Sequence, residues 1–217
     1  VDLIVVAEEL GRALTPSPFF ATLQGSLAVL HGGTDTQRKE ILPAVAAGRR
    51  VLSFAITEEA GNENADELAT RAAKSGSGWA LSGTKLFVPD AQNADAIVVA
   101  ARSGGAGEAG ISLFVVERGA PGLTITPLKS MDQTRRIAEV RFDGTPAQLL
   151  GREGSGWATW KTVRTHALVY LSAEALGGAQ KVLEDAVKYA KERIQFGKPI
   201  GVHQAIKHKC ADMLIEV

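Results

Sequence analysis

The hydrophobic positions of this chain fall into three successive blocks, and the first block predicts helices. Up to residue 48 the apolar residues recur at helical spacing. The first stretch of this kind contains Leu3, Val6, Leu10 and Leu14. A Thr-Pro-Ser-Pro run follows, and a second helix is predicted from about Phe19 to Leu30, ahead of a Gly-Gly pair typical of helix ends. Thr34 or Asp35 then caps a third helix that is expected to reach Gly48.

The second block consists of short apolar runs separated by Gly, Pro, Asn and Asp, from residue 49 to about residue 150. The runs are VLSFAIT, WALSGTKLFV, AIVVAAR, ISLFVVE, LTITPL and IAEVRF. Turn residues at intervals of about ten positions are typical of an antiparallel β domain. The pattern leaves both a barrel and a sandwich open.

The third block returns to helix at Trp157 and continues as one long apolar stripe without a proline. Gly177 and Gly178 weaken this helix by roughly 1 kcal/mol each relative to Ala. The run Phe196-Gly197-Lys198-Pro199 ends it, and a further helix is expected from about Val202. A helix of this length usually packs in a bundle or against a partner subunit.

Helices, then strands, then helices favour a segregated α+β fold rather than a βαβ sheet. We therefore expect an N-terminal helical domain at 1–48, a middle antiparallel β domain at 49–150 and a C-terminal helical bundle at 151–217. The chain has no initiator Met and stops inside a helical pattern, so both ends are expected to be truncated.

Composition excludes several functions. The 24 Lys and Arg residues balance 24 Asp and Glu residues, and no long basic run occurs, so nucleic-acid binding is not expected. Cys210 is the single cysteine, which excludes an intramolecular disulfide framework and fits a reducing, cytoplasmic location. No run of about 18 apolar residues predicts a membrane span.

The common catalytic motifs are missing from the sequence. It contains no GxGxxG after a strand, no P-loop, no GxSxG elbow and no HExxH. The four histidines, His31, His166, His203 and His208, fall on predicted helices, and no metal site is expected.

One segment near the C-terminus carries a family resemblance. Residues 192–208, ERIQFGKPIGVHQAIKH, closely resemble the ER-x-x-FG-(K/R)-x-I-x-x-x-QA signature of acyl-CoA dehydrogenases. Four other stretches agree in the same order: EELGRAL at 8–14, FAITE at 54–58, SGTKLFVP at 82–89 and EALGGAQ at 174–180. The resemblance spans the chain and implies the family's order of a helical domain, a β domain and a four-helix domain.

The resemblance implies FAD-dependent α,β-dehydrogenation of an acyl-CoA thioester to the trans-2-enoyl-CoA. In the family, a glutamate removes the α proton, the flavin N5 accepts the β hydride, and hydrogen bonds to the thioester carbonyl stabilise the enolate. It further implies a role in fatty acid or steroid side-chain degradation. The implied partners are electron-transfer flavoprotein, or a similar acceptor, and further subunits in a homo- or hetero-oligomeric dimer or tetramer.

Eight residues match the flavin-binding positions of the family: Phe54, Ile56, Thr57, Phe87, Arg193, Gln195, Phe196 and Gln204. The resemblance implies that Thr57 meets the flavin pyrimidine edge and that the last four bind FAD across a dimer interface. Core packing explains Phe54 and Ile56 equally well. Thr57 could be an ordinary strand end, and the helix dipole alone would favour Arg193 at a helix C-terminus.

Two features near Thr57 depart from the family pattern. Pro89 stands where a threonine often hydrogen-bonds flavin N5, and proline offers neither a hydroxyl nor an N–H. The loop after Thr57 lacks the family's serine and is expected to be a solvated acidic loop that repels a diphosphate. Its carboxylates are Glu58, Glu59, Glu63, Asp66 and Glu67.

The catalytic residue is unknown from the sequence. The family takes its glutamate from the position of Ala167 here or from a later helix, and His166 beside it is more often a structural residue. Thr165 and Leu168 replace an Asp and an Arg that often lie near the acyl-CoA.

Three hypotheses follow: an active acyl-CoA dehydrogenase, a partner subunit that completes a flavin site in a heteromeric dehydrogenase, or a binding protein on the same fold.

Overall fold

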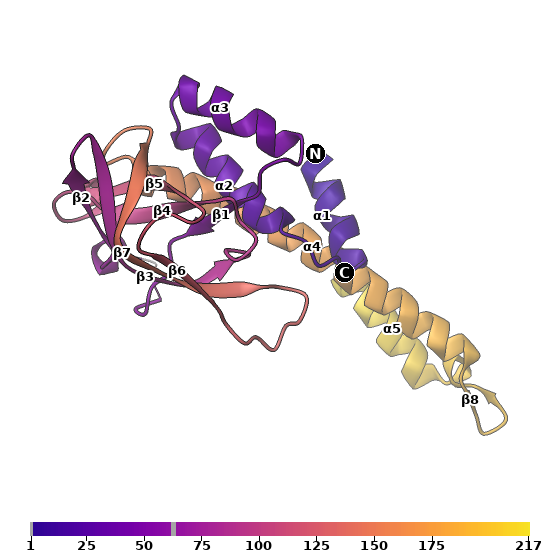
Figure 1. Cartoon of the computed structure of the whole chain (residues 1–217). Coiled ribbons are helices and arrows are strands. Elements are labelled where there is room, and N and C mark those ends of the chain that lie inside the picture. The colour runs from indigo at the N-terminus through magenta and orange to yellow at the C-terminus, as the bar shows by residue number, and fades with distance from the viewer. Residues whose placement is uncertain (1, 62–63) are drawn as a thin grey trace. The chain divides into compact units, whose positions relative to one another are not determined.

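The computed structural model of the chain describes residues 2–61 and 64–217 and divides into two compact units. The β unit comprises residues 16–167, and the helical unit comprises residues 2–15 and 168–217. The longest helix contributes to both units. Figure 1 follows the order of helices, then sheet, then helices along the chain, and this order confirms the predicted fold class.

The helices are α1 (Asp2–Arg12), α2 (Phe19–Gly32), α3 (Asp35–Ala46), α4 (Gly156–Glu192) and α5 (Gln204–Glu216). The strands are β1 (Leu52–Ala55), β2 (Arg71–Ser75), β3 (Gly78–Pro89), β4 (Ala96–Arg102), β5 (Ile111–Glu117), β6 (Leu123–Pro127), β7 (Ile137–Leu150), β8 (Ile194–Gln195) and β9 (Lys198–Pro199). Thr34 is the residue that caps α3, because its side chain accepts from Gln37 N while the Gln37 side chain accepts from Thr34 N. Of these elements, β2 and the β8–β9 hairpin were not predicted.

Five strands of the β unit close into a barrel. The strands β4, β2, β3, β7 and β5 pair in that order, and β5 pairs back to β4. The sheet is mixed, and the expectation of a wholly antiparallel domain was wrong in this respect. β1 pairs parallel with β4 along residues 52–55 and 96–99, and β2 meets β4 in parallel at Arg71 and Arg102. Apolar periodicity reports which face of a strand is buried and carries no information on strand direction.

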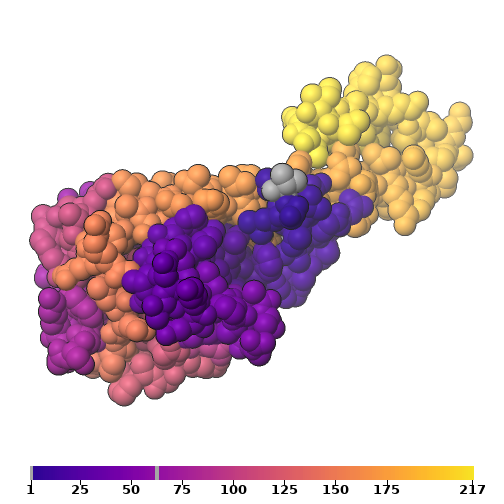
Figure 2. Space-filling model, turned by 90° about the horizontal axis from the view of Figure 1, so that it is seen from above, coloured from indigo at the N-terminus to yellow at the C-terminus, as the bar shows by residue number. Residues whose placement is uncertain are grey.

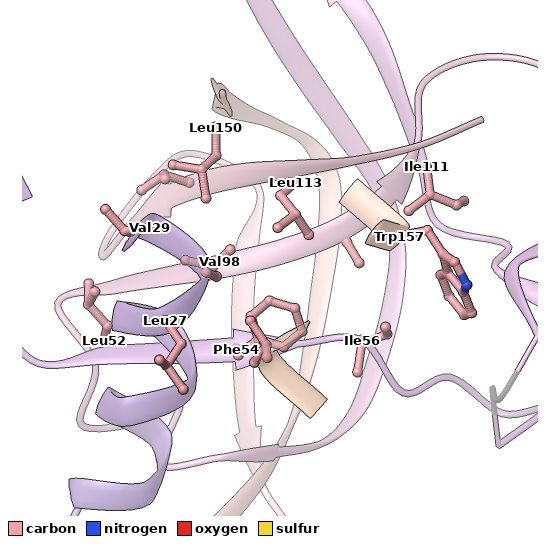
Figure 3. Close-up of a cluster of buried hydrophobic side chains, with 14 of the residues drawn as sticks. Leu27, Val29, Leu52, Phe54, Ile56, Val98, Ile111, Leu113, Leu150 and Trp157 are labelled. Carbon is pink, nitrogen blue, oxygen red and sulfur yellow. The ribbon is translucent and has the colours of Figure 1, made fainter. Parts of the chain in front are cut away.

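Two hydrophobic clusters fill the β unit. One lies inside the barrel and contains Leu81, Val88, Val99 and Phe114. The other joins the outer faces of β1, β4 and β5 to the helices through Leu27, Phe54 and Trp157, among others (Figure 3). Because β1, β4 and β5 are covered on both faces, their sequences are nearly continuous apolar runs.

The helical unit is built on a close contact between α1 and α4. A Cβ added at Gly177 would lie 1.9 Å from the Glu8 carbonyl oxygen, and one added at Gly11 would lie 1.9 Å from that of Glu174. The buried residues of α1 are therefore Ala7 and Gly11, and not the apolar stripe that its spacing suggested.

The helix α5 lies beside the C-terminal part of α4 in the same unit (Figure 2). It has no buried residue, and apolar side chains such as Leu214 remain exposed. Among the described helices, none has a stretch both long and apolar enough to cross a membrane.

Candidate functional site

Where β1 ends and β3 bulges, Thr57 pairs with Leu86, the residue that precedes Phe87. The Leu86 N–H donates a hydrogen bond to the Thr57 carbonyl oxygen at 2.8 Å. The register of β3 against β7 shifts between Lys85 and Val88, and both of these side chains are buried. Phe87, inside the bulge, adopts a φ of 53° and remains 58% exposed. A bulky residue in the left-handed region is strained, and such strain often marks a functional position.

The hydroxyl of Thr57 is available for a ligand. Thr57 is half-buried, and its carbonyl oxygen is satisfied by Leu86. Within residues 2–61 and 64–217, no side chain or backbone group hydrogen-bonds its hydroxyl. A hydroxyl without a partner among the described residues and an exposed aromatic ring on the adjacent strand suit a flat heteroaromatic ligand with polar edges.

Behind Thr57 lies a buried ion pair that the sequence analysis missed. Lys85 Nζ donates to Glu58 Oε1 at 2.6 Å and to the Ile56 carbonyl oxygen at 3.0 Å. The Glu58 carboxylate also accepts from the backbone N–H groups of Ala69 at 2.6 Å and Thr70 at 3.0 Å. The side chain of Lys85 is 0% exposed and that of Glu58 is 6% exposed.

This environment shifts the pKa of both partners. Burial raises the pKa of Glu58, but attraction to Lys85 and hydrogen bonds from Lys85, Thr70 and Ala69 outweigh it, so the net pKa is lowered. Burial lowers the pKa of Lys85 to about 8, and Glu58 partly offsets this effect. Both groups are therefore charged at neutral pH.

The prediction that the loop after Thr57 is solvated and acidic was wrong for Glu58. This carboxylate is buried and neutralised by Lys85, so it does not repel a diphosphate. Asp66 accepts a hydrogen bond from Gly107 N at 2.6 Å and lies 4.0 Å from the Arg102 guanidinium. Glu59 and Glu67 are exposed, as predicted. Glu63 lies outside the described residues.

Phe54 and Ile56 point into the helix-facing core of the β unit (Figure 3). Phe54 is 2% exposed and stacks on Trp160, with 5.2 Å between ring centroids. Packing thus accounts for both side chains. Pro89, at the end of β3, accepts a hydrogen bond from Ser53 Oγ at 2.6 Å through its carbonyl oxygen.

The other candidate residues lie on the β8–β9 hairpin and at the start of α5, within the helical unit. Phe196 and Gly197 form the two-residue turn with φ of 51° and 74°, as a type I′ hairpin requires. Phe196 is 92% exposed. Gln195 and Gln204 are also exposed, and Gln204 contacts His208 at 3.4 Å.

The guanidinium of Arg193 has no ion pair within the described part of the chain. Arg193 directly follows the last residue of α4, and its backbone closes the hairpin by accepting from Ile200 N at 2.8 Å. The hairpin therefore presents a cation and an aromatic ring to the outside of its own unit.

The three domains that define one protein family match this chain, in the same order along the sequence. The acyl-CoA dehydrogenase N-terminal domain matches residues 1–49, the middle domain matches residues 53–145, and the C-terminal domain matches residues 154–217. The chain belongs to the acyl-CoA dehydrogenase family.

Individual relatives agree with this assignment. An acyl-CoA dehydrogenase of Bacillus subtilis (strain 168) is 35% identical over 198 residues, which cover 88% of this chain and 52% of that protein. Butyryl-CoA dehydrogenase from Megasphaera elsdenii superposes with a TM-score of 0.91 at 31% identity, covering 98% of this chain and 58% of that one. A Tcur3481–Tcur3483 steroid ACAD variant has a TM-score of 0.81 at 36% identity, covering 99% of this chain and 56% of that one. The chain thus spans little more than half the length of these relatives.

The helix position that the family resemblance matched to a glutamate offers no base in this acyl-CoA dehydrogenase chain. Ala167 is buried. His166 beside it stacks on His31, with 5.4 Å between ring centroids, and its Nδ1 lies 2.9 Å from the Thr162 carbonyl oxygen. Thr165 donates to the Lys161 carbonyl oxygen at 3.0 Å. These contacts are local to the helix or to α2 and assign no proton-transfer role.

A signal for the buried pair was present in the sequence of this family member. Leu81, Gly83 and Lys85 occupy alternate positions of the predicted strand, so they share one face. Since Leu81 marks that face as buried, Lys85 had to be buried with a partner. The partner, Glu58, lies 27 residues away and only the fold identifies it.

Proposed function

We propose that the protein containing this chain is a FAD-dependent acyl-CoA dehydrogenase that converts an acyl-CoA thioester to the trans-2-enoyl-CoA. Two observations carry the proposal: Phe87 is exposed in the segment of β3 that pairs with Thr57, and the Thr57 hydroxyl has no partner within residues 2–61 and 64–217. Family membership supports the same activity. When bound, FAD would accept the hydride leaving the β-carbon, while a base takes the α proton and electron-transfer flavoprotein or a similar acceptor reoxidises the cofactor.

The residues present fit the ring system of FAD. Thr57 would hold a polar edge of the ring through its hydroxyl, and Phe87 would cover apolar ring surface. Because Lys85 neutralises Glu58, one of the loop carboxylates expected to repel the FAD diphosphate no longer does so. The contact usually made by a threonine hydroxyl at Pro89 would be missing.

We assign Arg193, Gln195, Phe196 and Gln204 to the FAD of a neighbouring subunit. All four are exposed on the helical unit. The planar guanidinium of Arg193 suits a diphosphate through charge and paired hydrogen bonds. The type I′ turn holds the ring of Phe196 outward.

A second candidate function is a partner subunit that completes the flavin site of an unlike chain. Pro89 and Ala167 favour it, because each lacks the functional group that the family uses at its position. The similarity to a steroid ACAD whose name joins Tcur3481 and Tcur3483 supports the same idea.

Two variants of the complete gene product separate these functions. If the chain binds its own flavin, Thr57→Val and Arg193→Met should each weaken FAD binding by about 5- to 150-fold and lower the flavin content of the protein expressed alone, since losing a hydrogen bond to a charged or polar ligand costs about 1–3 kcal/mol. Flavin absorbance per protein reports this, and bleaching by an acyl-CoA reports the reaction. Thr124→Val, on exposed β6, is the matched control.

A colourless protein would contradict the self-sufficient enzyme. If flavin then appears only with a second chain, and Arg193→Met abolishes it while Thr57→Val does not, the partner-subunit function stands. Flavin that is insensitive to both variants would contradict both functions.

A further inference from the structure

The Glu58–Lys85 pair is hard to explain as a stability device. Among the fully buried side chains that the structure describes, Lys85 is the largest by volume. Forming the pair has removed two charges from water. Replacing such a pair by apolar residues of similar size is often neutral or stabilising, because desolvation offsets the attraction. A role in specifying local structure is a better-supported reason for keeping it.

The hydrogen bonds of the pair hold the chain in place on both sides of Thr57. Lys85 Nζ donates to the carbonyl oxygen of Ile56 and to the side chain of Glu58, the two neighbours of Thr57. The next residue of β3, Leu86, donates to Thr57 itself. Three consecutive residues after β1 are thus fixed by two consecutive residues of β3.

The same pair anchors the bulge that exposes Phe87. Lys85 and Val88 both point inward, and this forces the two residues between them out of register with β7. The Glu58 carboxylate is in turn fixed by the N–H groups of Ala69 and Thr70, which directly precede β2. Gly83 permits the close passage of β3, since an added Cβ would lie 2.7 Å from Thr70 Cα.

We infer that the Glu58–Lys85 pair is the positioning element of the flavin site, orienting Thr57 and Phe87 together toward the ring of the cofactor. The inference rests on the proposed FAD contact of these two residues. Neither charged group touches the ligand; each acts through the backbone on either side of Thr57.

The test uses a variant in which burial is kept and charge is removed. Glu58→Met combined with Lys85→Met should fold, because it leaves no unpaired charge in the core. We expect the deflavinated double variant to bind FAD at least tenfold more weakly than the parent in a fluorescence titration. The matched control, Glu108→Met with Lys161→Met, removes an exposed ion pair of the same unit and should leave the dissociation constant unchanged.

A second measurement does not depend on flavin. Hydrogen exchange at the Leu86 amide, which donates to Thr57, should accelerate at least tenfold in the double variant. Exchange at Val98, paired with Val115 in β4–β5, should stay at the parent rate. If the double variant does not fold, Glu58→Gln combined with Lys85→Met keeps the shape of residue 58, also leaves no unpaired charge and should show both effects in the same direction.

The outcomes distinguish the positioning role of the Glu58–Lys85 pair from the proposed FAD-dependent function. A folded double variant with parental FAD affinity and parental Leu86 exchange would overturn the positioning role while leaving the proposed function intact. A parent that binds no FAD would overturn the proposed function, and Leu86 exchange alone would then decide whether the pair fixes the Thr57 segment. Weaker FAD binding with unchanged Leu86 exchange would also contradict the positioning role.

Discussion

The two units of this acyl-CoA dehydrogenase chain differ in where they place ion pairs and in how their elements approach each other. The β unit closes its sheet into a barrel, packs a core on each side of β1 and β4, and buries an ion pair in its interior. The helical unit brings α1 and α4 together through glycines, and its Arg12–Glu184 ion pair is exposed to water. Specific polar interactions thus matter most where the backbone surrounds a site, and close backbone approach matters most where helices cross.

The sharpest test of this contrast compares one residue from each ion pair. Lys85→Met should destabilise the β unit by about 3–5 kcal/mol, because it leaves a buried carboxylate without its cation. Arg12→Met should cause a far smaller loss, since water screens the exposed pair. Hydrogen exchange of amides in β4 and in α4 beyond residue 168 reports each unit separately. Equal losses in the two variants would contradict the contrast.

The next test examines the helix crossing with two adjacent glycines. Gly177→Ala should destabilise the helical unit by about 1–3 kcal/mol, because its Cβ would lie 1.9 Å from the Glu8 carbonyl oxygen and the helices would have to separate. Gly178→Ala should stabilise the unit by up to about 1 kcal/mol, since its nearest neighbour, Gly11 O, is 3.7 Å away and Ala favours helix. Urea titration followed by circular dichroism measures both changes. Two effects of the same sign would show that the crossing is not set by Gly177.

This crossing also shows what apolar patterning can and cannot predict. The sequence stretches around Gly11 and Gly177 were predicted as helical and matched to the family, and Gly177 and Gly178 were counted as helix-weakening. Their physical role depends on which helices meet, and that information is not contained in the period of one helix. Val6 and Leu14 carried the predicted stripe of the first helix and are exposed.

In the β unit, patterning succeeded where burial repeats along a strand. The runs in β3, β4, β5 and the start of β7 were predicted, because alternating or continuous apolar residues identify them. β2 was not predicted, because Ala72 is its only buried residue and it therefore lacks an apolar pattern. For the candidate site, Thr57 and Phe87 were matched through the family resemblance, and their role stays a prediction. The bulge that contains Phe87 and the partner of Lys85 depend on long-range pairing that local sequence does not encode.

The smallest expected effect concerns the exposed ion pair of the helical unit at low pH. Hydrogen bonds from Arg12 and then Gln180 hold the pKa of Glu184 at about 2, below its usual value of 4.5. Because the folded state lowers this pKa, the stabilisation is fully present above about pH 4.5 and is lost as pH falls toward 2. Glu184→Gln should therefore differ from the parent in unfolding free energy at pH 5 and match it near pH 2. High salt should shrink the difference at pH 5, since the pair is solvated. A difference that persists at pH 2 would mean that Glu184 contributes through packing rather than charge.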